Sequence, residues 1–225
     1  MCVIKAKVFT IQQNPNSQDK MSVGFGKNLN LGGEYNGAVN GPLIDSNSIF
    51  TGGYIDNKKQ IKNWEVSKED NSDNFNTRNG ILGADNKGNI FLSRSGSNTI
   101  PDNTQWAIQN GPVLLQDNEN LCSPQNTSKM IRTGIGYNDK NELIVIATEE
   151  KVTPYEFAEI FKQQGCKNAI YLDGYPEKSD NDPVGYKFQV TQSNGSIKIE
   201  EDKMQPQRPL LQFFHAKITE KEICD

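Results

Sequence analysis

The chain has 225 residues, of which 34% are hydrophobic, and it carries a formal net charge of −4. This length favours one large domain over two, and the abundance of Asn, Gly and Ser predicts many turns and short strands rather than a helical bundle. The acidic balance and the scattered basic residues argue against a nucleic-acid-binding protein, and no apolar stretch is long enough for a membrane span.

The first half of the sequence predicts β-structure. Short apolar runs alternate with Asn-Gly, Gly-Gly and Asn-Lys-Gly dipeptides throughout residues 1–120, and such dipeptides favour the positive φ angles of hairpin turns. Residues 3–11 and 21–25 are the first segments expected to be strands. Residues 86–92 are expected to form the second arm of a hairpin.

The next segment contains the clearest helix signal. Residues 142–148, ELIVIAT, form a nearly continuous apolar run that is typical of a strand buried on both faces. A helix is expected to follow, with Thr153 as its N-cap, Pro154 at its first position and Glu156 completing a capping box. Gly165 is expected to end it.

A strand, 169–173, is predicted after this helix. The order strand, helix, strand is compatible with a crossover unit that places Asp173 at the carboxyl end of its strand, where open α/β sheets tend to hold ligands. Beyond the polar loop 175–185, a hairpin turning at 194–195 and a final strand over 210–219 are expected.

Together these elements predict an α+β fold. We expect residues 1–225 to form a single domain with mixed, mostly antiparallel β-sheets flanked by a few helices. No internal repeat and no interdomain linker is visible in the sequence.

The four cysteines and the sole histidine do not form a recognisable zinc motif. No CxxC spacing occurs among Cys2, Cys122, Cys166 and Cys224, and His215 has no nearby partner in sequence. Free thiols are the favoured interpretation, with a Cys2–Cys224 disulfide as the alternative in an oxidising compartment. No metal and no other cofactor is therefore predicted, while a divalent ion is left open.

The N-terminal residues contain no secretory hydrophobic segment. Two interpretations of the compartment follow: a cytoplasmic protein if the chain is complete, or a periplasmic or secreted protein if a signal peptide has been removed.

Four short pieces carry residue types suited to a ligand site. Taken singly, each has an ordinary structural interpretation as a turn, a strand start or a surface arginine. In combination, a bidentate arginine suits a phosphate, glycines admit backbone amides to it, and an acid assists departure of an anomeric oxygen. The pieces are AVNGPLID with Asn40 and Gly41, AIQNGPVLL with Asn110 and Gly111, MIRTGIGY with Arg132 and Gly134, and GCKNAIYLDGY with Asp173 and Gly174.

In order and spacing, these pieces resemble the motifs of the phosphodiester glycosidase family. The resemblance is best over residues 38–174, and the Tyr-Leu-Asp-Gly strand end is most similar to the bacterial branch of the family. It implies a hydrolase that cleaves the glycosidic bond to a phosphodiester, in a sugar 1-phosphodiester or a similar phosphorylated sugar or nucleotide substrate.

The resemblance also implies which residues act. Asp173 and Arg132 are expected to be catalytic, with Asp173 acting as an acid or base, as an orienting group or as a stabiliser of the sugar cation. Asp45 or Glu177 is a candidate second acid. The expected substrate-binding residues are Asn40, Gly41, Asn110, Gly111, Gly134 and Gly174.

Two departures from the family pattern support an alternative. The animal-type branch continues its strand end as Leu-Asp-Gly-Gly-Gly-Ser, whereas this chain has LDGYPEKS, and NGPLI replaces an aromatic pair after Asn-Gly. The alternative is a non-catalytic binder of a phosphorylated sugar or nucleotide-like ligand on the same fold, or a structural envelope protein that binds a polysaccharide phosphate. In each case the expected partner is a small phosphorylated ligand, not a nucleic acid.

Overall fold

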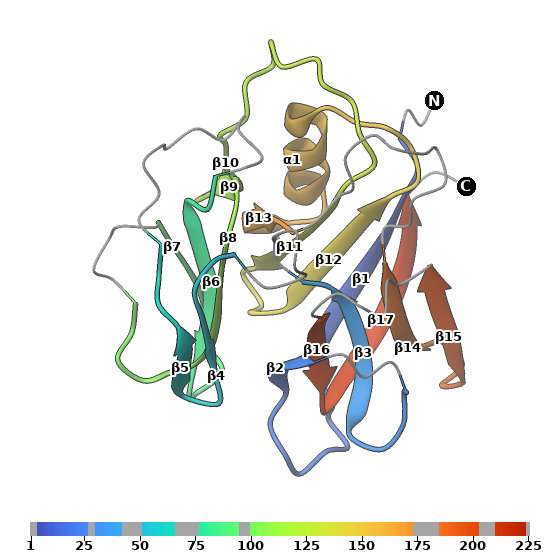
Figure 1. Cartoon of the computed structure of the whole chain (residues 1–225). Helices are drawn as coiled ribbons and strands as arrows, with labels where there is room; N and C mark the ends of the chain where they lie inside the picture. The colour runs from blue at the N-terminus through green and yellow to red at the C-terminus, as the bar shows by residue number, and fades with distance from the viewer. Residues whose placement is uncertain are drawn as a thin grey trace.

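The computed structural model describes residues 4–26, 30–41, 51–65, 77–94, 100–172, 185–202 and 210–223. Within these ranges the chain forms two β-sheets and one helix (Figure 1). The larger sheet contains β1 (Ala6–Gln13), β2 (Ser22–Gly26), β3 (Tyr35–Asn40), β9 (Val113–Gln116), β10 (Glu119–Asn120), β11 (Thr133–Asn138), β12 (Leu143–Thr148), β13 (Cys166–Tyr171), β14 (Tyr186–Thr191), β15 (Ile197–Asp202), β16 (Leu210–Phe214) and β17 (Ala216–Ile223). The smaller sheet contains β4 (Tyr54–Asp56), β5 (Lys59–Lys62), β6 (Gly80–Asp85), β7 (Ile90–Arg94) and β8 (Thr104–Asn110), and the helix is α1 (Pro154–Gln163).

Both sheets are mainly antiparallel, as predicted. The larger sheet has the order β10-β9-β13-β11-β12-β1-β17-β14-β3-β16-β2, with β15 paired to β14, and the smaller sheet has the order β5-β4-β8-β6-β7. The one parallel pair among the described strands joins β14 to β17 at Val190 and Ile218. The larger sheet is therefore mixed.

The prediction of a few helices is wrong. Among the described residues only α1 is an α-helix, so the fold is essentially all-β rather than α+β. The reason lies in the local sequence, because within the described ranges only the segment that starts at Thr153 combines a cap with helical spacing of its apolar residues. This helix is also too short and too polar to cross a membrane.

Helix α1 begins as its sequence predicts. Thr153 Oγ1 accepts from the backbone amide of Glu156 at 3.1 Å, and the carboxylate of Glu156 accepts from the amide of Thr153 at 2.8 Å. The helix buries Phe157, Ile160 and Phe161 against one face of the larger sheet. It connects β12 to β13, which both pair antiparallel with β11 between them, and so completes the predicted crossover.

Strand β12 separates two apolar cores. Ile144 and Ile146 face the helix side, while Leu143 and Val145 belong to the cluster on the other face. That second cluster includes residues of β6 and β8, so the smaller sheet packs against the face opposite the helix. The apolar run ELIVIAT is therefore buried on both faces, as predicted.

The prediction of one final strand over 210–219 is wrong in one respect, because the strand is interrupted at His215. This residue has a φ of 54° and separates β16 from β17. A positive φ is incompatible with a continuous strand, so the residues on either side join different neighbours. The predicted hairpin at 194–195 is confirmed as the β14–β15 connection, with Gly195 at a φ of 82°.

Candidate functional site

The candidate site is built around the carboxyl end of β13. Here the amide of Tyr171 donates to the carbonyl of Pro112 at 3.0 Å, and the amide of Leu172 donates to the carbonyl of Thr133 at 3.0 Å. These bonds tie the strand end to the β9 side and to the β11 side. Because both residues are also buried, the strand end that precedes Asp173 is held from two sides.

Asn110 contacts this strand end directly. Its side chain is fully buried, and its Nδ2 donates to the carbonyl of Tyr171 at 2.7 Å and to that of Leu172 at 3.0 Å. Both amide protons are thus used on the backbone of β13. In this arrangement Asn110 fixes the strand end.

Gly111 lies where no side chain fits. A Cβ at this position would come within 2.7 Å of the Thr77 carbonyl and 2.8 Å of Asn79 Oδ1. Asn79 Oδ1 itself accepts from the amide of Val113 at 2.8 Å. Gly111 therefore permits the segment before β6 to approach the start of β9.

Arg132 lies on the β11 side of the same strand end and is fully buried. Its Nε donates to the carbonyl of Val152 at 2.9 Å, and its Nη2 donates to that of Ser128 at 3.0 Å. The guanidinium carbon lies 5.9 Å from the centroid of the Tyr171 ring, within the range of a cation–π contact. This geometry excludes a surface arginine.

Burial disfavours the charge of Arg132, and neighbouring side chains offset only part of this effect. Burial lowers the pKa of Arg132, and Tyr171 and Cys122 act in the opposite direction. An arginine remains protonated in such an environment, so a positive charge lies beside the end of β13. Two of its donors bind backbone carbonyls.

Gly134 faces the helix. A Cβ here would lie 2.9 Å from the carbonyl of Ile170 and within 3.1 Å of the rings of Phe157 and Phe161. Its lack of a side chain therefore allows α1 to pack closely on the sheet.

Asn40 and Gly41 lie at the end of β3, and both are buried. The amide of Asn40 donates to the carbonyl of Gly185 at 2.8 Å, while its side-chain oxygen is buried and has no hydrogen-bond partner among the described residues. In the sheet order, β11, β12, β1, β17 and β14 lie between β13 and β3. The described contacts thus bring Asn110, Arg132 and Gly134 to β13 and place Asn40 on a separate strand.

Four of the predicted residues lie outside the described part of the chain. They are Asp173, Gly174 and the two candidate second acids, Asp45 and Glu177. The same holds for Cys2 and Cys224, whereas Cys122 and Cys166 are buried free thiols.

Gln109, which belongs to the piece AIQNGPVLL, lies in a polar cluster next to Asn110 that is not apparent from the sequence. Gln109 is fully buried and donates to the carbonyls of Glu65 at 2.6 Å and Arg78 at 3.1 Å. Arg78 in turn donates to Thr51 Oγ1 at 2.8 Å and pairs with Glu65 at 3.3 Å. The available signal is the polar stretch NTRN immediately before the apolar strand β6.

Known proteins match this chain in sequence. The family model described as phosphodiester glycosidase matches residues 33–179. The uncharacterized protein YigE of Escherichia coli strain K12 is 25% identical over 149 residues, which cover 65% of this chain and 58% of YigE.

Two solved structures share the fold. The catalytic domain of zebrafish N-acetylglucosamine-1-phosphodiester alpha-N-acetylglucosaminidase, auto-inhibited by its pro-peptide, matches with a TM-score of 0.52 and 18% identity over 83% of this chain and 64% of that one. A hypothetical protein from Synechocystis matches with a TM-score of 0.52 and 12% identity, over 96% of this chain and 59% of that one. The chain thus spans less than two thirds of the length of each of these relatives.

Proposed function

This chain belongs to the phosphodiester glycosidase family, and on that premise we propose that it is a hydrolase that cleaves the glycosidic bond to a phosphodiester. Its substrate class would be sugar 1-phosphodiesters or similar phosphorylated sugars and nucleotides. The observation that carries this proposal is that the family match, residues 33–179, contains every candidate site residue from Asn40 to Gly174.

The proposed reaction adds water to the anomeric carbon. The bond from that carbon to the phosphate-bearing oxygen breaks, and the oxygen leaves with the bonding electrons. Asp173 is the proposed acid, which transfers a proton or stabilises the positive charge that develops on the sugar ring. It directly follows Leu172, whose carbonyl binds Asn110.

Asn110 and Arg132 are assigned a positioning role in this scheme. Asn110 donates to the carbonyls of Tyr171 and Leu172 at the end of β13, and two donors of Arg132 bind the carbonyls of Val152 and Ser128. The buried charge of Arg132 would still favour the ionised form of an acid at this strand end.

The test is an assay for sugar release. Wild type and Asp173→Asn are incubated with a panel of sugar 1-phosphodiesters, nucleotide sugars and cyclic and linear nucleotide diesters, and free sugar is followed by mass spectrometry. Wild type should release sugar from at least one compound, and Asp173→Asn should lower turnover by about 10²-fold or more while retaining the fold. Asp139→Asn is the matched control, because Asp139 is 82% exposed in its pair with Lys167.

A non-catalytic binder is the second candidate. It is favoured by the use of two Arg132 donors on the carbonyls of Val152 and Ser128, which leaves fewer donors for a phosphate. The sequence LDGYPEKS in place of a glycine run points the same way. Calorimetric binding of one panel compound that both wild type and Asp173→Asn return intact would contradict the enzyme and support the binder.

A further inference from the structure

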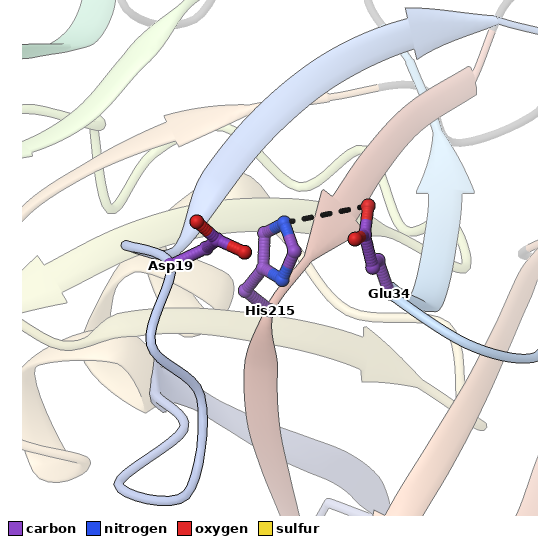
Figure 2. A group of neighbouring side chains, drawn as sticks. All are labelled: Asp19, Glu34 and His215. Carbon is purple, nitrogen blue, oxygen red and sulfur yellow. Dashed lines mark ion pairs between the residues drawn. The ribbon is translucent and has the colours of Figure 1, made fainter.

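Three potential metal ligands converge at the opposite end of β3 from Asn40. Asp19, Glu34 and His215 come from segments far apart in the sequence, and one donor atom from each lies within 4.8 Å of the others. Figure 2 shows the two carboxylates on either side of the imidazole ring. Glu34 and Asn40 are six residues apart along an extended strand, so this cluster lies about 20 Å from the Asn40 end.

The backbone holds the three segments together. The amide of His215 donates to the carbonyl of Glu34 at 2.8 Å, and its carbonyl accepts from the amide of Asn14 at 3.1 Å. The carbonyl of Asp19 accepts from Gln13 Nε2 at 2.6 Å. The donor atoms are therefore carried by a frame that is already assembled, which reduces the conformational entropy that a ligand would otherwise have to overcome.

The imidazole is oriented as in a metal-binding histidine. Its Nδ1 lies 3.4 Å from Ser17 Oγ, and its Nε2 lies 3.7 Å from the carboxylate of Glu34. Ligating histidines commonly direct the second ring nitrogen to an oxygen, which fixes the tautomer with its lone pair on the metal side. In the tautomer that carries its proton on Nδ1, the N–H is directed to Ser17 Oγ and the lone pair lies on Nε2, the nitrogen nearer to the carboxylate of Glu34.

We propose that Asp19, Glu34 and His215 bind a divalent metal ion of the Zn²⁺ type. One imidazole and two carboxylates are ligands that Zn²⁺ accepts, and the two negative charges balance those of the ion. Donors bound to one ion at about 2.1 Å lie roughly 3–4 Å from one another. Small side-chain rotations would bring the three donor atoms from their present separations to these distances. The ion would link the segments that carry Asp19 and Glu34 to His215, between β16 and β17.

The test uses the full chain without an affinity tag, stripped of metal by a chelator. Because His215 is the sole histidine, its ring signals in an NMR spectrum are unambiguous. Stoichiometric Zn²⁺ should shift these signals, calorimetry should give one Zn²⁺ per chain, and the melting temperature should rise with Zn²⁺ concentration.

Variants separate metal binding from folding. His215→Asn retains a residue that tolerates positive φ, so it should fold while its affinity for Zn²⁺ falls at least tenfold. Asp19→Asn and Glu34→Gln should each weaken binding by a similar factor, whereas Asp139→Asn should leave it unchanged.

Thiols are the competing ligands, and a Cys2→Ser, Cys224→Ser background removes the two that lie outside the described residues. Burial raises the pKa of Cys166 to about 12, which makes that thiol a poor ligand. Zn²⁺ that leaves the His215 signals unmoved, or that binds His215→Asn as tightly as wild type, would overturn the proposal.

Discussion

At the scale of single residues, Arg132 shows how burial changes the meaning of a sequence motif. The motif IRTGIGY suggests a phosphate-binding arginine, and the resemblance to the family supports that role. The guanidinium is nevertheless fully buried and binds the carbonyls of Ser128 and Val152. Its first contribution is therefore to the structure around the end of β13.

We predict that Arg132→Lys lowers the free energy of unfolding by about 2–3 kcal/mol. A lysine keeps the charge but cannot reproduce two diverging N–H donors from one planar group. Urea unfolding measures the loss, and Arg78→Lys is the matched control, because Arg78 forms a partly exposed pair with Glu65 and should change stability by less than about 1 kcal/mol. Equal losses in the two variants would show that the contacts of Arg132 contribute no more to the free energy of unfolding than those of Arg78.

Sequence reasoning identified Asn110 and Arg132 but not what their side chains contact. Asn110 binds carbonyls 61 and 62 residues away. No local signal encodes such a contact, because it depends on which strands become neighbours. The motifs therefore identify which residues belong to the candidate site, and only the fold shows which groups their side chains contact.

At the scale of elements, the sequence predicts a helix or strand boundary correctly where all the residues that define it lie in one short segment. The N-terminus of α1 carries a capping residue, a proline and a glutamate at the required spacing, and its predicted start is confirmed. The break between β16 and β17 was not predicted, since LLQFFHAKIT contains neither glycine nor proline at the turn. The positive φ of His215 occurs where its backbone carbonyl binds the amide of Asn14 and its amide binds the carbonyl of Glu34.

Thr153→Ala should lower stability by about 1 kcal/mol, because the amide of Glu156 loses its side-chain acceptor. Thermal and denaturant unfolding measure the change. Glu156→Gln is the control: it keeps an oxygen that accepts from the amide of Thr153, so its effect should be smaller. An unchanged midpoint in Thr153→Ala would mean that the cap contributes nothing to stability.

A second element-scale feature is the ion cluster on β1, β15 and β17. Lys7 Nζ lies 2.9 Å from the carboxylates of Glu200 and Glu220 and 3.1 Å from that of Glu222. Burial alone would lower the pKa of Lys7, but the three carboxylates raise it overall. Burial raises the pKa of Glu200, but Lys198 and Lys7 outweigh this and lower it overall.

A carboxylate with a lowered pKa in the folded protein stabilises the fold above its unfolded pKa, and this contribution disappears as the pH falls through its folded pKa. We therefore predict that Glu200→Gln lowers stability by about 1–2 kcal/mol at pH 7, and that the difference from wild type shrinks as the pH falls below about 4.3. Denaturant unfolding across this pH range is the measurement. Glu201→Gln, which alters a more exposed pair with Lys187, is the control and should lower stability at pH 7 by less than Glu200→Gln does.

At the scale of the whole molecule, the sequence predicted the mostly antiparallel character of the sheets but not their arrangement. The hairpins follow from turn dipeptides, which are local. The pairing of β1 with β17 joins residues near opposite ends of the described chain, and no sequence signal specifies it. The overestimate of helix content arose from expecting further helices where the sequence offers a single capped one.

The two sheets share one apolar core, and this argues that residues 1–225 unfold as a unit. Trp106 and Ile108 of the smaller sheet belong to the same buried cluster as Phe9, Val145 and Ile218 of the larger sheet. Separating the sheets would expose these side chains to water, at roughly 25 cal/mol for each Å² of apolar surface. We therefore expect a single cooperative transition in which the fluorescence of Trp106 and the far-ultraviolet circular dichroism of the chain change together. In a Trp64→Phe background Trp106 is the sole tryptophan, so its fluorescence reports on the smaller sheet and on its contact with the larger one. Two separated midpoints would instead identify the smaller sheet as an independently unfolding part, and the single-domain prediction would fail.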